Sequence, residues 1–292
     1  MNEPLLSVIL PAYNEEDCIT QTIRDVRSAL EKAHISHEII VVDDGSKDQT
    51  AERARNENVV LVQHEGNQGV GAARKTGIRQ AKAEWVGTTD VDGTYPNEDI
   101  PRLFKTFQDH NLDMVIGARI GPNVAREWPH RAIPKFLIRR LASYLCQRSI
   151  PDLNSGLRIF KKAAALDYFY LLPDSHSWES TITLAFLCNK KRVEFVPIDY
   201  YKRKGGRSSF APIRDTYNYV TLVVRTTMYF NPLRIFIPLS FFIAVTGMIK
   251  TVYDWVVYHH IGSLDVIIVL GGMMVLLVGL IADLIVVVSR RK

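Results

Sequence analysis

The stretch Trp85-Val86-Gly87-Thr88-Thr89-Asp90-Val91-Asp92-Gly93-Thr94-Tyr95-Pro96 decides the fold prediction, because an apolar strand in it leads directly into two carboxylates and a turn. Residues i and i+2 of a strand point to the same face, so Asp90 and Asp92 are expected to converge where the strand ends. Two such carboxylates suit Mg²⁺ or Mn²⁺, since these hard cations also bind substrate phosphates. Asp-x-Asp alone is a weak signal, because an acidic turn that opens a helix has the same residues.

Strand and helix patterns alternate on the N-terminal side of this stretch. Strands are expected at 6–10, 38–42, 59–62 and 85–89, with helices at 50–56 and 71–82 and a further helix after the first strand, whose apolar face carries Ile19, Ile23, Val26 and Leu30. The alternation predicts an α/β fold with a mostly parallel, doubly wound central sheet, in which ligands bind beyond the carboxyl ends of the strands. Several polar or ring-bearing residues are expected at that edge: Pro11, Tyr13, Glu15, Asp43, Asp44, Asp90 and Asp92.

The acidic groups at one sheet edge would repel one another unless a cation or hydrogen-bond donors were bound there. The edge is therefore interpreted as a metal–nucleotide site, with helix capping by Asp43, Asp44 and Glu15 as the alternative. The glycine-rich run from Gly69 to Arg74 lacks the strand-turn-helix context of a dinucleotide site. It is interpreted as a close-packed helix start.

The motifs of the chain, taken together, resemble those of family 2 glycosyltransferases with the GT-A fold, and most of all the dolichyl- and polyprenyl-phosphate hexose synthases. The motifs are Pro11–Glu15, Val41–Ser46, Asn67–Gly69, Asp90–Asp92, Gly117–Arg119, Asn154–Arg158 and Arg203–Ser208. The resemblance implies a set of nucleotide-binding residues: Pro11, Ala12, Tyr13, Glu15, Val42, Asp44, Asp90, Val91 and Asp92. It also implies a cation held by Asp90 and Asp92. Thr94, a weaker neutral ligand, stands where many relatives have a metal-binding Gln.

The C-terminal third of the sequence predicts a membrane hairpin. Two apolar runs at about 234–257 and 265–288 are each long enough to cross a hydrocarbon core of about 30 Å. The expected organisation is a GT-A catalytic domain at 1–209, a juxtamembrane amphipathic helix at 210–232, and the hairpin with a basic tail at 233–292. Basic residues flank the hairpin and are absent from its turn, so the catalytic domain and both termini are expected in the cytoplasm.

Two charged positions inside the hairpin have alternative interpretations. Lys250 is expected to pair with Asp254 one turn later or to reach the outer membrane surface. Asp283 is either a functional intramembrane carboxylate or an interfacial group near Arg234 or Arg290.

Composition agrees with a membrane enzyme. The 292 residues accommodate one domain and a hairpin, and the net charge of +5 is concentrated in short basic segments that suit anionic lipid or a phosphate acceptor better than nucleic acid. Cys18, Cys146 and Cys188 are scattered and odd in number, as expected of reduced thiols. No cleavable signal is expected at the N-terminus. The sequence leaves homo-oligomerisation open.

A lipid phosphate acceptor determines the expected mechanism. It is anionic at neutral pH, so it can attack a nucleotide sugar, GDP- or UDP-linked, without a strong base, and the family resemblance implies inversion. The residues expected to hold the acceptor phosphate or the donor diphosphate are Arg119, Arg131 and Arg203. A sugar hydroxyl acceptor would need a base, for which Asp152 and Glu179 are the candidates, although Asp152 also suits a cap and Glu179 a structural place in the helix at 178–189.

Two other functions stay open at this point. One is transfer onto a lipid-linked saccharide or polysaccharide, although the chain lacks the Gln-x-x-Arg-Trp motif of processive synthases. The other is a non-catalytic membrane scaffold of the same fold. The intact Asp44, Asp90 and Asp92 favour an enzyme.

Overall fold

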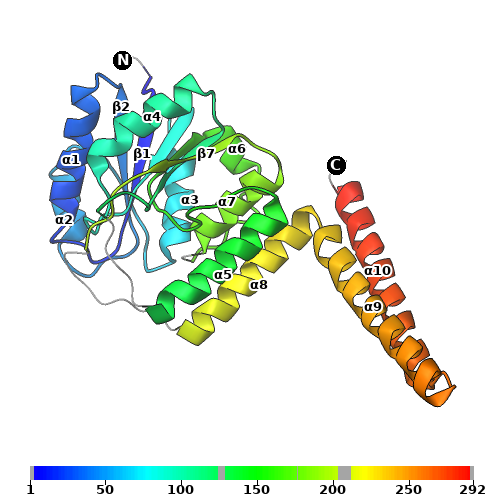
Figure 1. Ribbon diagram of the computed structural model, residues 1–292. Helices are drawn as coiled ribbons and strands as arrows, with labels where there is room; N and C mark the ends of the chain where they lie inside the picture. The colour runs from blue at the N-terminus through cyan, green and yellow to red at the C-terminus, as the bar shows by residue number, and fades with distance from the viewer. Residues whose placement is uncertain (1–2, 124–128, 176, 203–211, 290–292) are drawn as a thin grey trace.

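The computed structural model describes residues 3–123, 129–175, 177–202 and 212–289 (Figure 1). The chain first forms an α/β domain around a seven-stranded sheet, with strand order β3-β2-β1-β4-β6-β5-β7. The strands are β1 (Leu6–Ala12), β2 (His37–Asp43), β3 (Val60–Gln63), β4 (Trp85–Thr88), β5 (Met114–Ala118), β6 (Arg158–Lys161) and β7 (Val193–Pro197). The helices of the domain are α1 (Ile19–Lys32), α2 (Thr50–Arg55), α3 (Val70–Gln80), the short η1 (Asn97–Asp99), α4 (Ile100–Asp109), α5 (Pro129–Cys146), α6 (Lys162–Leu166), α7 (Trp178–Cys188) and α8 (Pro212–Phe230).

The prediction of a mostly parallel sheet is confirmed. β1 pairs in parallel with β2 and β4, β2 with β3, and β5 with β7. The exception is β6, which runs antiparallel between β4 and β5. β6 is only four residues long and begins and ends with a basic residue, so its apolar pattern is too short to identify from sequence.

Helices cover both faces of the sheet, and the alternation along β1 shows why. Leu6, Val8 and Leu10 pack with α1 and α4 on one face, whereas Ile9 packs with α3 and α7 on the other. The predicted face of α1 is fully buried. Burial of one such aliphatic side chain contributes about 1.5–3 kcal/mol, so these layers fix the sheet whose edge carries the site.

A third layer, formed by α5 and α8, packs outside α7 (Figure 1). The side of α8 that faces the protein carries Val223, Thr226, Thr227 and Phe230. Val220 and Val224 belong to the same helix, which the sequence predicts to be amphipathic, and they stay exposed and half-exposed, respectively. The helix therefore has one side on the domain and apolar residues that the domain does not fully cover.

The cysteines are less scattered in space than in sequence. Cys146 at the end of α5 and Cys188 at the end of α7 bring their sulfur atoms to 2.9 Å. None of the three cysteines forms a disulfide in the described structure.

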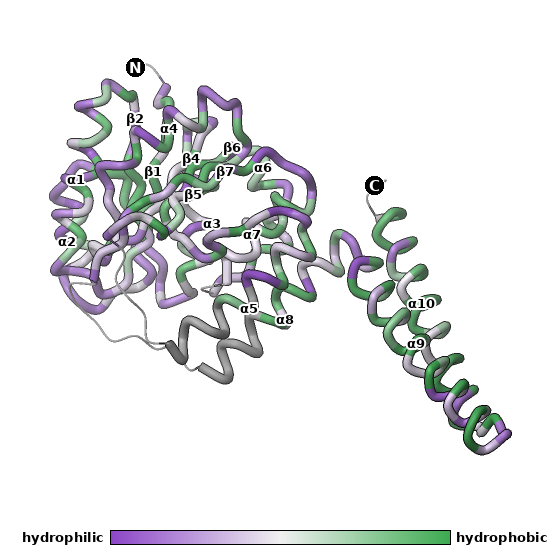
Figure 2. Tube along the Cα trace, in the orientation of Figure 1, coloured by the Kyte–Doolittle hydropathy of each residue, from purple (hydrophilic) through white to green (hydrophobic). Residues whose placement is uncertain are grey.

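Two long helices, α9 (Leu233–Tyr258) and α10 (Ser263–Ser289), pack against each other and extend away from the domain (Figures 1 and 2). Both are long and apolar enough to cross a membrane, as predicted for this region. Small residues allow close packing: a Cβ on Gly272 would lie 3.0 Å from the backbone nitrogen of Ala244.

The charged groups of the hairpin are placed mainly at its far end. Lys250 Nζ lies 2.5 Å from Asp254 Oδ2, as predicted, and also 2.5 Å from Asp265 Oδ1 on α10. At the near end, Arg234 donates hydrogen bonds to the Leu145 carbonyl and to Gln147 Oε1. The guanidinium group of Arg234 therefore bonds to the domain and forms no ion pair with Asp283 in the described structure. Asp283 is half-buried and has no recorded ion pair within the described chain.

Candidate functional site

The carboxyl ends of β1, β2 and β4 meet at one edge of the sheet, as the sequence predicts. The Asp44 amide donates to the Ala12 carbonyl over 2.8 Å, and the Thr89 amide donates to the Ile9 carbonyl over 3.3 Å. The acidic residues that follow β2 and β4 are therefore brought to the same edge. A parallel sheet places ligands there.

Asp44 is buried and accepts hydrogen bonds from its own domain. The amides of Gln68 and Gly69 donate to its two oxygens over 2.9 and 2.8 Å. His64 Nδ1 lies 2.7 Å from Asp44 Oδ1, while its Nε2 lies 3.0 Å from the hydroxyl of Thr76. These contacts fix the Asp44 carboxylate and the loop before α3 in one arrangement.

The loop before α3 is also held by close backbone packing. Gly69 has φ +101°, and a Cβ there would collide with the carbonyl of Asp174. A Cβ on Gly71 would collide with the carbonyl of Pro173. The interpretation of Gly69–Arg74 as a close-packed helix start is confirmed, because only glycine fits both positions.

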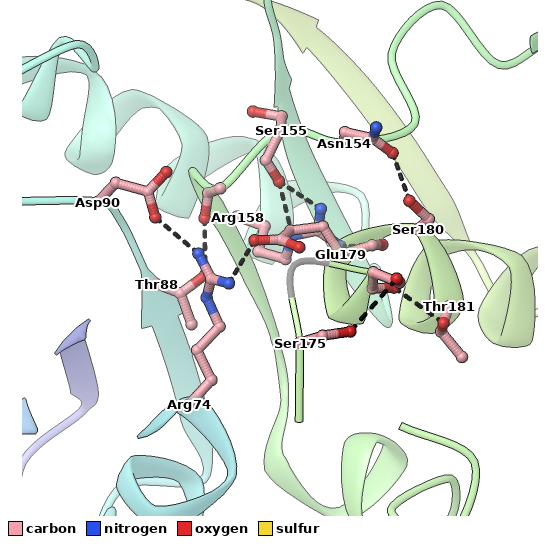
Figure 3. Close-up of polar contacts among 12 residues, drawn as sticks. Arg74, Thr88, Asp90, Asn154, Ser155, Arg158, Ser175, Glu179, Ser180 and Thr181 are labelled. Atoms are coloured by element: carbon pink, nitrogen blue, oxygen red, sulfur yellow. Dashed lines mark hydrogen bonds and ion pairs between the residues drawn. The ribbon is translucent and has the colours of Figure 1, made fainter. Parts of the chain in front are cut away.

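Asp90 and Asp92 both follow β4, and each has a donor within the domain. Arg74 Nη2 of α3 lies 2.6 Å from Asp90 Oδ1 (Figure 3). The amide and hydroxyl of Thr94 donate to Asp92 Oδ1 over 3.1 and 2.6 Å. Thr94 is buried and thus orients Asp92 in this structure.

Arg74 connects Asp90 to a buried charge cluster formed by Arg74, Arg158 and Glu179 (Figure 3). The guanidinium groups of Arg74 and Arg158 lie 5.4 and 5.8 Å from the centroid of the Trp178 ring. Arg74 Nη1 pairs with Glu179 Oε1, and Arg158 Nη1 donates to the Glu179 carbonyl over 3.2 Å. Burial lowers the pKa of Arg158 to about 10, which still leaves it charged at neutral pH. Glu179 Oε2, Ser155 Oγ and Trp178 Nε1 have no hydrogen-bond partner in the described part of the chain.

The segment before β6 closes over Asp90. A Cβ on Gly156 would lie 2.6 Å from Asp90 Oδ2, so only glycine allows this approach. The Gly156 amide donates to the hydroxyl of Tyr95 over 2.7 Å, and its carbonyl accepts from Thr88 over 2.7 Å. Burial raises the pKa of Tyr95, so its phenol stays neutral and donates or accepts hydrogen bonds without adding charge.

Arg119, at the end of β5, is paired with Asp152. Its Nε and Nη2 atoms donate to the two carboxylate oxygens of Asp152 over 2.7 and 2.8 Å, and its guanidinium lies 5.1 Å from the ring of Tyr200. Burial alone would raise the pKa of Asp152, but the hydrogen bonds and charge of Arg119 outweigh it and hold that pKa below its ordinary value. An ionised carboxylate paired in this way is a weak base, which favours a structural role for Asp152.

The residues at the sheet edge suit a cation that shares its ligands with a substrate. Asp90 and Asp92 are both half-buried, and each is oriented by a hydrogen-bond donor of the domain. Among the described residues, no group of three or more His, Cys, Asp or Glu side chains would hold a metal ion. Mg²⁺-type sites with one or two carboxylates complete their coordination with water and substrate phosphates.

The other predicted residues divide into three groups. Pro11, Ala12, Val42 and Val91 are buried, so only their backbones are available to a nucleotide. Tyr13 is 41% exposed and Glu15 is half-exposed, and both follow β1 at this edge of the sheet. Arg131 lies on α5 with its side chain outside the described part of the structure, and Arg203 lies wholly outside it.

The sequence reasoning did not assign Arg74 and His64 to the site. A signal existed for Arg74, because it shares a helical face with Ile78 four residues later and that face is buried against the sheet. An arginine on a buried face requires a carboxylate partner. His64 follows an ordinary strand and has no such signal.

The chain matches known protein families over both of its parts. The family model described as glycosyl transferase family 2 matches residues 7–169, and the model described as the GtrB C-terminal hairpin matches residues 231–287. The low-salt glycan biosynthesis hexosyltransferase Agl6 of Haloferax volcanii is 26% identical over 257 residues, which is 86% of this chain but 60% of that protein.

A second relative and a solved structure extend the comparison. The undecaprenyl-phosphate 4-deoxy-4-formamido-L-arabinose transferase of Pseudomonas syringae is 28% identical over 266 residues, 84% of this chain and 71% of that protein. Glucosyl-3-phosphoglycerate synthase of Mycobacterium tuberculosis, crystallised with Mn²⁺, UDP and glucosyl-3-phosphoglycerate, is 18% identical with a TM-score of 0.58, over 77% of this chain and 79% of that one.

Proposed function

Because the chain belongs to glycosyl transferase family 2, we propose that it transfers a hexose from a nucleotide sugar to a dolichyl or undecaprenyl phosphate at a membrane surface. The observation that carries the proposal is the presence, in one chain, of a GT-A domain with an acidic sheet edge and of a GtrB-type hairpin. The Pseudomonas relative, named for transfer to undecaprenyl phosphate, supports the same acceptor class.

The donor binds at the edge formed by β1, β2 and β4. Tyr13, Glu15 and Asp44 lie around the base and ribose of a UDP- or GDP-linked sugar, and Asp90 and Asp92 hold Mg²⁺ or Mn²⁺ beside its diphosphate. When bound, the cation stabilises the negative charge of the departing nucleoside diphosphate. Arg74 donates to Asp90 and holds its carboxylate in place, and Thr94 does the same for Asp92.

The acceptor phosphate needs alignment more than proton removal. It is already anionic, so it displaces the diphosphate with inversion and without a general base. Arg119, Arg131 and Arg203 hold the phosphate groups. Asp152 and Glu179, the candidates for a base, are each bonded to an arginine, which agrees with an acceptor that brings no proton to remove.

The hairpin anchors the enzyme where the lipid acceptor is found. The basic residues that flank the hairpin favour a topology with both termini and the catalytic domain in the cytoplasm, where nucleotide sugars are available. The two helices hold the sheet edge at a fixed distance from the bilayer surface.

The test uses membranes that contain the full chain. They are incubated with a panel of radiolabelled nucleotide sugars and a polyprenyl phosphate, with the Asp92→Asn variant as control. We expect label from one sugar to appear in an organic-soluble, acid-labile product only with the wild-type protein. Label found only in polysaccharide, or released as free sugar regardless of acceptor, would contradict the proposed acceptor.

A further inference from the structure

An open groove of about 790 Å³ runs along α5, separate from the residues that follow β1, β2 and β4. Its walls include Ile120, Phe136, Arg139, Arg140, Tyr144 and Arg148. The volume lies in the range of ligand pockets, roughly 300–1,000 Å³. No Asp or Glu is found among the described residues that line this α5 groove.

The arginines of the α5 groove gather without a balancing charge. The guanidinium groups of Arg139 and Arg140 lie 5.9 and 5.6 Å from the centroid of the Phe136 ring. Arg139 donates to the Pro151 carbonyl over 2.7 Å, which fixes it in the wall. The side chains of Arg140 and Arg148 are exposed, and neither has a recorded polar partner within the described residues. Like charges held close together favour the binding of an anion.

The α5 groove lies beside the start of the hairpin. Gln147 lines the groove, and its Oε1 atom accepts a hydrogen bond of 2.9 Å from Arg234 in the first turn of α9. In Figure 1, α5 and α8 run across the direction of α9 and α10. A hairpin that crosses a bilayer along its length therefore sets α5 along the membrane surface, at the level of the lipid headgroups.

The exposed aromatic residues of the groove also suit a position at the membrane surface. Phe136 and Tyr144 are 47% and 62% exposed, whereas Phe104, Phe107 and Trp178 are buried in the domain core. Aromatic rings are enriched at the boundary between headgroups and acyl chains, and basic side chains near it attract anionic lipid.

We propose that the α5 groove binds the phosphate headgroup of an anionic bilayer phospholipid and thereby holds the catalytic domain against the membrane surface. The arginines contact the phosphate, and Phe136 and Tyr144 contact the first carbons of the acyl chains. The proposed ligand is a bilayer lipid and not the reacting acceptor, because Arg119 is not among the described residues that line the groove, although Ile120 beside it is. The proposal requires the membrane hairpin but not the transfer reaction.

The experiment measures lipid retained by the purified full chain. The protein is equilibrated with equal amounts of phosphatidylglycerol and phosphatidylcholine in detergent, and bound lipid is counted by native mass spectrometry. The variant Arg140→Gln/Arg148→Gln should bind phosphatidylglycerol roughly 25-fold more weakly, since each basic residue near an anionic headgroup contributes about fivefold. Arg140→Lys/Arg148→Lys should recover most of the binding.

The control removes the same charge elsewhere. Lys32→Gln/Lys105→Gln changes exposed residues of α1 and α4, and it should leave lipid retention as in the wild type. The proposal is overturned if the groove variant retains phosphatidylglycerol like the wild type, or if phosphatidylcholine is retained equally well.

Displacement of phosphatidylglycerol by a short isoprenyl phosphate would assign the groove to the acceptor, and displacement by millimolar inorganic phosphate would make it a simple anion site. Either result also overturns the proposal. No nucleotide sugar is present, so these outcomes are independent of the proposed transferase activity.

Discussion

At the sheet edge, Asp44, Asp90 and Asp92 each accept hydrogen bonds from the domain itself, whereas the side chains of Arg140 and Arg148 in the α5 groove have no polar partner among the described residues. The first region is oriented before any ligand arrives, and the second carries charges that only an external anion would balance. Preorganised charge suits chemistry, because little reorganisation is then needed during the reaction. Exposed, unbalanced charge suits reversible attachment to a surface.

The largest expected effect comes from removing a carboxylate at the preorganised edge. Asp92→Asn should lower turnover roughly 10³-fold, because the charge that stabilises the leaving diphosphate depends on it. Mn²⁺ affinity, measured by electron paramagnetic resonance, should fall as well, and a chelator should abolish wild-type activity. Asp109→Asn, at the exposed end of α4, is the control and should match the wild type. Full activity in chelator would remove the metal from the mechanism.

The second test removes Arg74, which donates a hydrogen bond to Asp90 at the sheet edge. Arg74→Met leaves Asp90 and Glu179 without their shared partner and should destabilise the domain by about 3–5 kcal/mol, as for other buried pairs that lose one member. Thermal unfolding measures the loss. The double variant Arg74→Met/Glu179→Gln should recover part of it, because the partly buried carboxylate is then neutral. An unchanged unfolding temperature for Arg74→Met would show that Asp90 does not need Arg74.

The third test separates the edge from the membrane. A chain truncated after Asn231 keeps the sheet and α8, so it should still bind the nucleotide sugar with metal. It should glycosylate a long polyprenyl phosphate about 100-fold more slowly, because enzyme and acceptor are no longer concentrated at one surface. A short water-soluble isoprenyl phosphate should be affected less. Equal losses on both acceptors would mean that the hairpin forms part of the reaction centre.

The smallest expected effect concerns the Arg119–Asp152 pair. The pKa of Asp152 is depressed in the folded protein relative to about 3.9 in the unfolded chain, so the pair stabilises the fold above that pH. This contribution disappears as the pH falls through the lower folded pKa. Asp152→Asn should therefore cost about 2 kcal/mol at pH 7, and the difference from wild type should shrink below about pH 4. A difference that stays constant down to pH 2 would contradict the assigned pair.

Much of the edge was predictable because local patterns determine it. The alternation of strands and helices gave the sheet, and Asp44, Asp90 and Asp92 follow strands whose ends meet in the structure. The family identified from the motifs is confirmed over residues 7–169. The individual roles of the site residues stay predictions.

The contacts between distant segments were not predictable in the same way. Asp90 meets Arg74 and Glu179 only after α3, β4 and α7 have packed together, and no periodicity in the sequence encodes that meeting. The same applies to Asp265 as a partner of Lys250, since the pair joins two helices. The α5 groove forms only because of where α5 packs in the fold. In the sequence alone, its arginines cannot be distinguished from ordinary charged residues on a helix surface.

The ion pair at the far end of the hairpin bears on how this chain enters a membrane. Lys250, Asp254 and Asp265 lie at the end of the hairpin remote from the catalytic domain, which crosses the hydrocarbon layer first in the proposed topology. A lone ammonium or carboxylate crosses at a high cost in free energy, whereas a paired set hides much of its charge. Because Lys250 on α9 reaches Asp265 on α10, insertion of the two helices together costs less than their passage one after the other. The biogenesis of this protein thus favours a helical hairpin as the inserted unit.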